Sequence, residues 1–278
     1  MITARLKGGL GNQMFQIAAA HGAANIHGTS MAIDLSIKHH SGQGHPHKKY
    51  DDNLYKNIPR FKFKDTQFEM YNELKFSYDP IPAPTSEDRH LILDGYFQTE
   101  KYFEHCKDEI QELFHIPDDI KAGVKAKLEK IKNHFNRDKA VCIHVRRGEY
   151  LQLPNIHPVQ TKEFFTEAMN QFDYSDVVYI VISDDIDWCV DNINYYKTAF
   201  CNTGYSYDTE PVTEDLGELF DMHLASQCEG NIISNSSFGW WGAWLNASDN
   251  KVIAPSKWFG PDGPQDHKDV YAREWIKR

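Results

Sequence analysis

The sequence predicts an α/β fold built on parallel sheets, because short apolar strands alternate with segments of helical periodicity along most of its 278 residues. Two apolar runs, 140–145 and 177–183, show no alternation of apolar and polar residues, which is typical of strands covered on both faces. Polar clusters follow both runs, at the edge where open α/β sheets bind ligands. The length suggests about two domains, and we expect the polar stretch 136–139 to separate domains at 1–136 and 137–278.

The chain begins with a predicted strand, turn and helix. The strand covers 2–6, the glycine-rich turn 7–13 and the helix 14–26, and a second strand follows at 30–34. Glycines let the backbone approach a ligand closely, and a helix amino-terminus presents unpaired N–H groups, so this turn is a candidate ligand site. It matches neither the dinucleotide fingerprint nor a P-loop. A simple tight turn is the alternative.

Residues 36–90 carry no clear motif. The segment holds a group of histidines among Gly, Ser and Lys: His39, His40, His45 and His47. No acidic or cysteine partner stands at metal-ligand spacing, so we interpret the segment as a loop, either near an acceptor or merely solvated, and expect no metal site. A strand at 91–97 and helices at 101–114 and 117–134 are expected next.

The strand 177–183 ends in two acidic residues, Asp184 and Asp185. A carboxylate at that edge either accepts hydrogen bonds from a nucleoside or, as Asp185 or Asp187, caps the following helix. Ser236 and Ser237 stand at another predicted strand-to-helix turn and indicate a phosphate cradle. The remaining expected elements are helices at 161–172 and 216–228, the latter capped by Asp215, strands at 231–235 and 251–254, and a closing helix at 270–277, for which packing back onto the first domain is left open.

Two adjacent arginines, Arg146 and Arg147, follow the central strand 140–145 and indicate phosphate binding. Arginine is charged at any working pH, and its planar fork of donors matches phosphate oxygens. A surface ion-pair cluster is the alternative. The net charge of −10 argues against a nucleic-acid partner, so an anionic ligand has to be held by a local cluster.

The five cysteines are odd in number, far apart and without zinc-site spacing, and we interpret them as reduced, in a cytoplasmic protein. The amino-terminus lacks a basic region followed by an apolar core. No stretch reaches the length of a membrane span. We therefore expect neither secretion nor membrane insertion.

Four segments stand in an order that resembles the α-1,2-fucosyltransferase family, glycosyltransferase family 11. They are GGLGNQMFQIA, HVRRGEY, VISDD and ISNSSFGWWGAWL, and the resemblance covers residues 1 to about 260. Gly239 replaces a serine that is usual in the family, and Glu149 stands where the family commonly has aspartate. The resemblance implies a GT-B fold, with two Rossmann-like domains facing each other across a cleft.

The resemblance also implies an activity. The expected enzyme is an inverting, metal-independent galactoside α-1,2-fucosyltransferase that moves L-fucose from GDP-β-L-fucose to the 2-hydroxyl of a terminal galactose in an oligosaccharide acceptor. GDP-fucose is a co-substrate, and no cofactor is expected. The domain at 1–136 would hold the acceptor and the domain at 137–278 the donor. A GDP-fucose transferase of another linkage, and a non-catalytic GDP-sugar or glycan-binding protein on the same fold, remain as alternatives.

Carried onto this sequence, the resemblance implies that Arg146 and Arg147 bind the pyrophosphate. His144 and one of Asp184 or Asp185 would contact the guanosine. Two arginines that bind the leaving group more tightly as its charge grows would lower the barrier, so Arg147 is also a catalytic candidate.

Donors from two further segments complete the implied site. Ser236, Ser237 and Phe238 would present hydroxyl and backbone donors to the β-phosphate. The turn between Gly8 and Gln13 would close over the donor. Its candidate donor-binding residues are Gly9, Gly11, Asn12 and Gln13.

Inversion requires a group that takes the proton of the attacking hydroxyl, and Glu149 is the candidate base by position. An ion pair in which Glu149 aims Arg147 is the alternative. A dissociative path, in which the departing phosphate takes the proton, needs no base.

Overall fold

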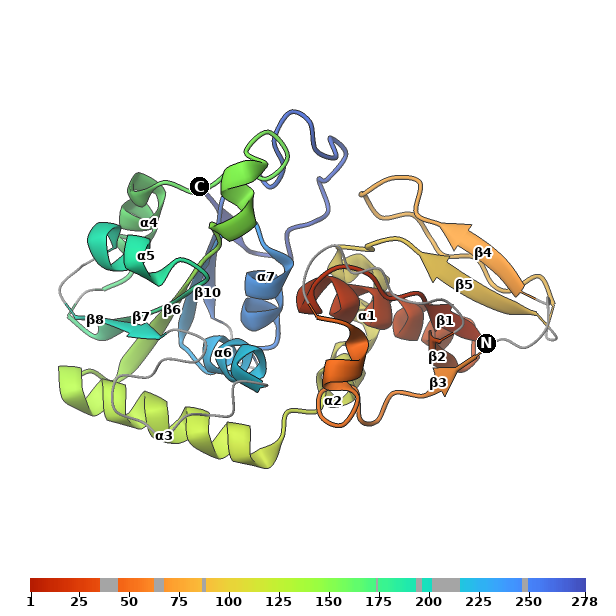
Figure 1. The fold of residues 1–278 in the computed structure, drawn as a ribbon, viewed down its shortest axis with the longest axis horizontal. Helices are drawn as coiled ribbons and strands as arrows, with labels where there is room; N and C mark the ends of the chain where they lie inside the picture. Colours follow the sequence, from red (N-terminus) through yellow and green to blue (C-terminus); the bar gives the residue numbers. More distant parts are fainter. Residues whose placement is uncertain are drawn as a thin grey trace. The chain divides into compact units, whose positions relative to one another are not determined.

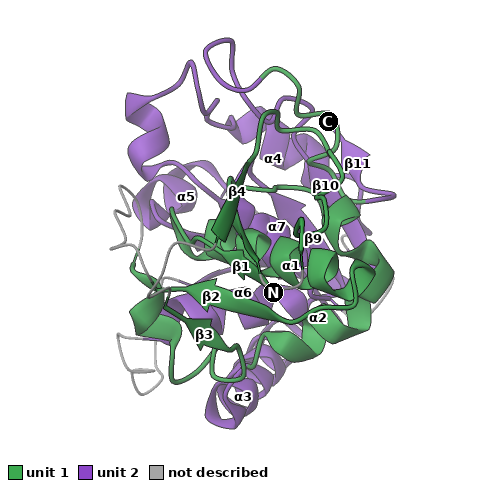
Figure 2. Cartoon of the chain, turned by 90° about the vertical axis from the view of Figure 1, so that its right-hand side faces the viewer, with its two compact units in different colours: residues 1–115, 265–272 green, residues 116–264, 273–278 purple. Residues whose placement is uncertain are grey.

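The computed structural model describes residues 1–35, 45–62, 68–86, 89–173, 175–193, 197–201, 216–246 and 250–278. The chain divides into two compact units, which Figure 2 colours separately. Unit 1 comprises Met1–His115 and Gln265–Ala272, and unit 2 comprises Ile116–Pro264 and Arg273–Arg278. The first unit boundary therefore precedes the long helix at 118–135, whereas the sequence analysis placed it after that helix. Each unit contains one parallel sheet, which confirms the predicted α/β class.

The sheet of unit 1 has the strand order β3-β2-β1-β5-β4, and all neighbouring strands are parallel. Its strands are β1 (Ile2–Ala4), β2 (Met31–Asp34), β3 (Arg60–Phe61), β4 (Phe68–Asn72) and β5 (His90–Asp94). Helix α1 (Leu10–Ile26) follows β1 and is buried along most of its length. It begins at Leu10, four residues before the predicted start, so the glycine-rich turn is partly helical.

The helix predicted at 101–114 is wrong over its first half. Instead, two 3-10 turns, η2 (Glu100–Tyr102) and η3 (Glu104–Cys106), precede a shorter helix, α2 (Lys107–Leu113). Between the two turns Phe103 has a φ of −145°, which is outside the helical range. Its ring is fully buried and packs against Phe15 at 6.2 Å, so tertiary packing overrides the local helical pattern. A further turn, η1, covers His47–Tyr50.

The sheet of unit 2 has the order β11-β10-β9-β6-β7-β8 and is also parallel. Its strands are β6 (Lys139–Val145), β7 (Val177–Ser183), β8 (Thr198–Cys201), β9 (Gly230–Ile233), β10 (Lys251–Ala254) and β11 (Ile276–Lys277). Strand β7 is buried throughout, and β6 is buried except at its first residue. The prediction of two strands covered on both faces is confirmed.

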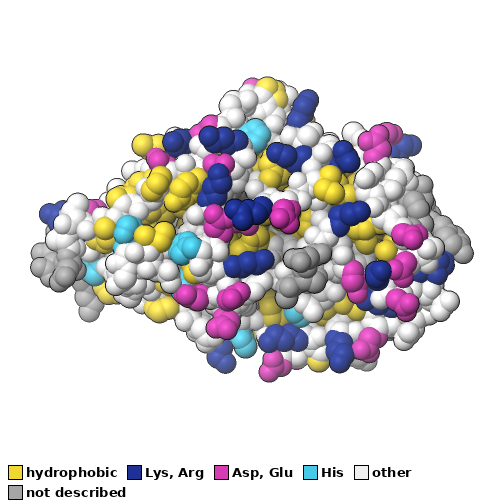
Figure 3. Space-filling view, turned by 180° about the vertical axis from the view of Figure 1, so that it is seen from behind, with side chains coloured by type: hydrophobic (Ala, Val, Ile, Leu, Met, Phe, Trp, Pro, Cys, Tyr) yellow, Lys and Arg dark blue, Asp and Glu magenta, His cyan; other side chains and the backbone are white. Residues whose placement is uncertain are grey.

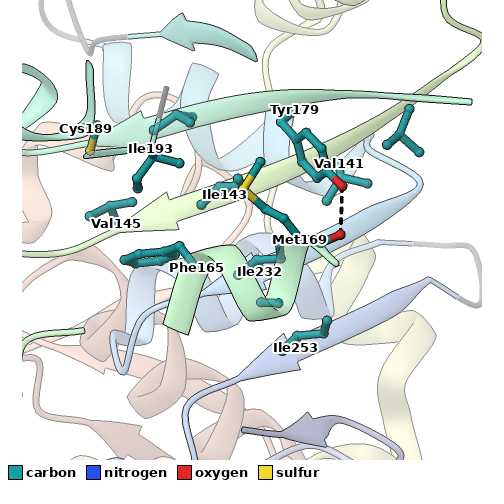
Figure 4. Packing of buried hydrophobic residues seen from close by; sticks show 13 residues of the cluster. Val141, Ile143, Val145, Phe165, Met169, Tyr179, Cys189, Ile193, Ile232 and Ile253 are labelled. Carbon is teal, nitrogen blue, oxygen red and sulfur yellow. Dashed lines mark hydrogen bonds between the residues drawn. The ribbon is translucent and has the colours of Figure 1, made fainter. Parts of the chain in front are cut away.

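Helices cover both faces of this sheet, and Figure 1 shows α4 and α5 on one side and α6 and α7 on the other. The helices are α3 (Asp118–Phe135), α4 (Lys162–Met169), α5 (Ile186–Asn192), α6 (Gly217–Ser226) and α7 (Ser237–Trp244), with a 3-10 turn, η4 (Gly148–Gln152). Alternate residues of β6 and β7 pack against α4 and α5 (Figure 4), where the Tyr179 hydroxyl donates to the Met169 carbonyl at 2.9 Å. Full burial of each such side chain contributes about 1.5–3 kcal/mol.

The helix predicted at 270–277 is wrong. Residues 276–277 form β11, which pairs with β10, and Glu274 has a φ of 70° in the left-handed region, which interrupts any continuous helix. The residues before this point, Gln265–Ala272, belong to unit 1. Asp215, the predicted cap of α6, lies outside the described residues, as do His39 and His40.

All five cysteines are buried free thiols. Among the helices that the structure describes, none combines the length and apolar character that crossing a bilayer requires.

Candidate active site

The predicted site residues of unit 2 come together at the carboxyl edge of its sheet. Strand β6 lies between β9 and β7, so the segments that follow these three strands are neighbours. Ser234, after β9, links two of them: its hydroxyl donates to the His144 carbonyl at 3.1 Å and accepts from the Arg146 backbone N–H at 3.1 Å. The histidine, the arginine pair, the acidic pair and the serine turn therefore form one cluster.

Arg146 lies between two carboxylates. One of its terminal nitrogens pairs with Glu149, and the other is 3.0 Å from an oxygen of Asp184. Its guanidinium also lies over the Tyr150 ring, 5.5 Å from the centroid. The sequence analysis offered an ion pair between Glu149 and Arg147 as an alternative role for Glu149. The structure shows such an ion pair, but its arginine is Arg146.

Arg147 is held by a carboxylate and an indole. Its Nε donates to Asp185 at 2.9 Å, and its guanidinium carbon lies 3.9 Å from the ring centroid of Trp188. The second oxygen of Asp185 accepts from the Trp188 backbone N–H at 3.3 Å, which caps α5. The prediction that Asp185 or Asp187 caps this helix is confirmed for Asp185. Two guanidiniums and three carboxylates give the cluster a local formal charge of −1.

Asp184 organises the turn that carries the arginines. Besides its ion pair with Arg146, it accepts from the Arg147 backbone N–H at 2.9 Å. Gly148 packs closely against it, since a Cβ at 148 would lie 2.5 Å from an oxygen of the Asp184 carboxylate and would displace it. The observed contacts of Asp184 and Asp185 are thus directed at the arginines and at α5.

His144, at the end of β6, is only 7% exposed and packs on Phe238, with ring centroids 5.5 Å apart. Its Nδ1 atom has no hydrogen-bond partner among the described residues. Burial, together with the charge of Arg146, lowers the pKa of His144 to about 3, so the imidazole is neutral at neutral pH. Gly239 closes the other side, because a Cβ at this position would lie 2.5 Å from Nδ1.

Helix α7 follows β9 after the short turn 234–236, and Ser236 is its N-cap residue without a side-chain cap bond. The N–H groups of the first helical residues, Ser237, Phe238 and Gly239, have no intrahelical acceptor. The Ser236 hydroxyl instead interacts with the phenol of Tyr150, which donates to the Asn235 carbonyl at 3.2 Å. The first turn of α7 therefore presents backbone donors beside the arginines.

The glycine-rich turn of unit 1 is fixed by buried amides. The side chain of Gln13 donates to the carbonyls of Gly8 at 2.9 Å and His45 at 2.8 Å. Asn12 accepts from Gln98 at 2.7 Å, and Gly9 is the N-cap of α1 without a side-chain cap bond. Gln13 is fully buried, and these hydrogen bonds of its side chain fix the shape of the turn. Gly11 is also buried, in the first turn of α1.

Several contributors were missed by the sequence analysis. Trp188 carried a usable signal, since it lies one turn into the helix that follows the acidic pair. Tyr150, Ser234 and Asn235 lie within or beside the recognised motifs, but their contacts depend on the neighbouring strand. Within the described ranges, no group of three His, Cys, Asp or Glu side chains is arranged to hold a metal ion. His47, from the predicted loop, pairs with Asp51 at 3.2 Å.

Comparison with known proteins adds a family. The family profile described as Glycosyl transferase family 11 matches residues 1–278. The chain is 29% identical to an alpha-1,2-colitosyltransferase of Escherichia coli, over 93% of this chain and 92% of that protein. It is 27% identical to the O-antigen biosynthesis glycosyltransferase WbnK of Escherichia coli, over 91% of this chain and 93% of that protein. It is 25% identical to the galactoside 2-alpha-L-fucosyltransferase Sec1 of Mus musculus, over 91% and 67%.

Solved structures agree with the fold. The fucosyltransferase NodZ from Bradyrhizobium has a TM-score of 0.52 and 16% identity, over 87% of this chain and 90% of that chain. A NodZ alpha-1,6-fucosyltransferase soaked with GDP-fucose has a TM-score of 0.53 and 16% identity, over 88% of this chain and 91% of that chain. The likeness at this identity concerns the fold alone, and it confirms the predicted GT-B class.

Proposed function

The chain belongs to glycosyl transferase family 11, and we propose that it moves L-fucose from GDP-β-L-fucose to the 2-hydroxyl of a terminal galactose. The observation that carries this proposal is the arginine pair at the end of β6, beside the first turn of α7. Two relatives support this linkage. One is named an alpha-1,2-colitosyltransferase and the other a galactoside 2-alpha-L-fucosyltransferase.

The arginines and α7 suit a diphosphate leaving group. Breaking the bond between fucose C1 and the β-phosphate oxygen leaves both bonding electrons, and thus negative charge, on GDP. Arg146 and Arg147 offer charged donors, and the first turn of α7 offers backbone N–H groups at a positive helix end. Donors placed where charge develops stabilise the transition state more than the ground state. We assign to these groups the charge stabilisation that Mg²⁺ provides in metal-dependent transferases.

Glu149 is the proposed base, and its carboxylate is paired with Arg146 in the structure. The donor diphosphate competes with Glu149 for the Arg146 guanidinium. When Arg146 turns to phosphate, the carboxylate is free to accept the proton of the acceptor hydroxyl as its oxygen bonds to fucose C1. In the alternative path the departing phosphate takes that proton, and Glu149 serves only to hold Arg146.

Transfer of colitose is the second candidate, because the chain is 29% identical to an alpha-1,2-colitosyltransferase. Colitose is L-fucose without the 3-hydroxyl, so a single polar contact to that hydroxyl would distinguish the two donors. A site that hydrogen-bonds a substrate hydroxyl rejects the deoxy analogue by about 10⁴–10⁵, whereas an apolar pocket discriminates far less. The ratio of kcat/KM for the two donors therefore reports which sugar the site is built for.

The test is incubation of the protein with GDP-fucose and lactose in EDTA, with GDP release and the product both followed. The proposal expects GDP release that depends on lactose and a product in which NMR correlates fucose H1 with galactose C2. A product linked through another carbon would refute the linkage. Saturable binding of GDP-fucose without release would identify a binding protein instead, and a higher kcat/KM for GDP-colitose would favour the second candidate.

A further inference from the structure

The indole of Trp188 lies against Arg147 in the donor cluster of unit 2. The guanidinium carbon is 3.9 Å from the ring centroid, and the Arg147 side chain is only 14% exposed. We propose that Trp188 is a positioning residue for Arg147, which fixes the guanidinium plane so that its two terminal nitrogens meet the diphosphate together. This inference takes the identity of the ligand from the proposed function, whereas the contact between Trp188 and Arg147 is observed independently of it.

The two contacts of the Arg147 guanidinium, with Asp185 and Trp188, do not involve the edge formed by its two terminal nitrogens. Asp185 occupies Nε, and Trp188 covers a face. In the part of the chain that the structure describes, Nη1 and Nη2 of Arg147 have no carboxylate partner. This edge is the fork that binds two phosphate oxygens at once. An arginine already held in the bound orientation loses less side-chain entropy when the ligand arrives.

Trp188 is itself fixed by the core. Its ring packs edge-on against Phe165, with centroids 6.4 Å apart and planes at 64°. Phe165 is fully buried beneath β6 and β7, and the Asp185 cap fixes the start of α5. The orientation of Arg147 is therefore set by the rigid interior of unit 2. Arg146 differs, because its ring contact is longer at 5.5 Å and both of its terminal nitrogens are paired with carboxylates.

The first test compares two substitutions at Trp188. Trp188→Leu removes the aromatic face, whereas Trp188→Phe keeps one. The expected result is a dissociation constant for inorganic pyrophosphate and for GDP that rises about tenfold in Trp188→Leu and about two- to threefold in Trp188→Phe. With GDP-fucose and acceptor, kcat should fall in the same order, while the acceptor KM stays unchanged.

The matched control is Phe172→Leu. Phe172 also lies under a cation, Lys251 at 5.2 Å, but beside the first residues of β9 and β10, at the opposite edge of the same sheet. This variant should bind pyrophosphate like the wild type. Wild-type affinity in Trp188→Leu, or equal losses in the Leu and Phe variants with unchanged thermal stability, would overturn the inference.

A second readout does not depend on turnover. In ¹⁵N-arginine-labelled protein the Arg147 Nε–H signal is identified by its loss in Arg147→Lys. Ring current from Trp188 should shift this signal in the wild type and in Trp188→Phe, and the shift should disappear in Trp188→Leu. An identical signal in the wild type and Trp188→Leu would refute the positioning role. If the donor assignment is wrong, the wild type fails to turn over GDP-fucose while the pyrophosphate and NMR effects persist.

Discussion

Arg146 and Arg147 are neighbours in sequence but are held in different ways. Arg146 is shared between Glu149 and Asp184, whereas Arg147 is fixed by Asp185 and Trp188. Because three carboxylates surround two guanidiniums, the cluster carries no net positive charge. In the proposed donor complex, the diphosphate would displace a carboxylate from Arg146, and we expect this competition to limit donor affinity.

Glu149→Gln separates these effects. Loss of the Arg146 ion pair should tighten GDP binding by about two- to fivefold, the range expected for a partly exposed pair. If Glu149 is also the base, kcat should fall by about 10²–10⁴. Calorimetric titration with GDP and steady-state GDP release measure the two quantities. Glu167→Gln, an exposed change on α4, is the control, and weaker GDP binding in Glu149→Gln would contradict the proposed competition.

Gly239→Ser tests the packing around His144. A Cβ at 239 would lie 2.5 Å from Nδ1, so the imidazole has to move away from α7. We expect a loss of about 1–3 kcal/mol in the free energy of unfolding in urea, together with weaker GDP binding. Gly239→Ala introduces the same Cβ without a hydroxyl that could bond Nδ1, so it should be at least as destabilising. Wild-type unfolding midpoints in both variants would show that the contact is not tight.

At the scale of elements, the continuous strands were the most predictable. Strand β7 and strand β10 match their predicted ranges, because a run of buried apolar residues is a local signal. Strands β3 and β11 have two residues each and exist only through their partners β2 and β10, so no sequence period marks them. The closing helix was wrong for the same reason: pairing with β10 and the left-handed Glu274 decide the conformation there.

Helix α6 carries a buried acid that makes stability depend on pH. Burial, reinforced by the nearby Glu218, raises the pKa of Asp221 to about 8. The unfolded value is about 3.9, so between about pH 4 and 8 the folded chain binds a proton that the unfolded chain lacks. The stability contributed by protonated Asp221 is therefore complete below about pH 4 and is lost as the pH rises towards 8.

Asp221→Asn, which keeps the shape and removes the charge, should flatten this dependence. The variant should exceed the wild type in unfolding free energy at pH 8.5, by on the order of 2–5 kcal/mol, and the difference should shrink towards pH 5. Urea unfolding at both pH values measures this difference. Parallel pH profiles for the two proteins would show that Asp221 does not titrate in this range.

The segment Gln265–Ala272 is attached to unit 1 by two aspartates. Asp266 accepts from the Phe76 backbone N–H at 3.1 Å, and Asp269 accepts from Lys101 at 2.7 Å and from the Tyr78 backbone N–H at 3.0 Å. Burial would raise the pKa of Asp269, but the bonds from Lys101 and Tyr78 outweigh burial and lower it. The stability from Asp269 is therefore present above about pH 4 and is lost as the pH falls below the unfolded value.

Asp269→Ala should destabilise unit 1 by about 1–2 kcal/mol at pH 7, because a partly buried N–H and a cation lose their acceptor. Hydrogen exchange should show the loss as faster exchange at Tyr78. The exposed Asp262→Ala is the control, since among the described residues Asp262 is bonded through its backbone N–H, to the Asn155 carbonyl. Unchanged exchange in Asp269→Ala would contradict the proposed attachment.

At the scale of the whole molecule, the net charge of −10 makes anion binding a local property. Figure 3 shows basic and acidic side chains interspersed over the face in view, without a broad basic patch. The sequence could predict which residues of unit 2 gather, because parallel strands bring their carboxyl ends to one edge. It could not predict which carboxylate each arginine pairs with, nor the indole beneath Arg147, because these depend on side-chain packing between neighbouring strands. It also could not predict that the side-chain amide of Gln13 donates to Gly8 in its own turn and to the distant His45.

The most direct test is the rate of GDP release from GDP-fucose with lactose in EDTA, for the wild type, Arg146→Ala and Arg147→Ala. We expect the wild type to turn over without metal and to change little when Mg²⁺ is added. Each alanine variant should lose about 10²–10³ in kcat, because a fixed donor to the leaving group is gone. A wild type that is inactive in EDTA and restored by Mg²⁺, or arginine variants that retain the wild-type kcat, would contradict stabilisation of the leaving group by this cluster.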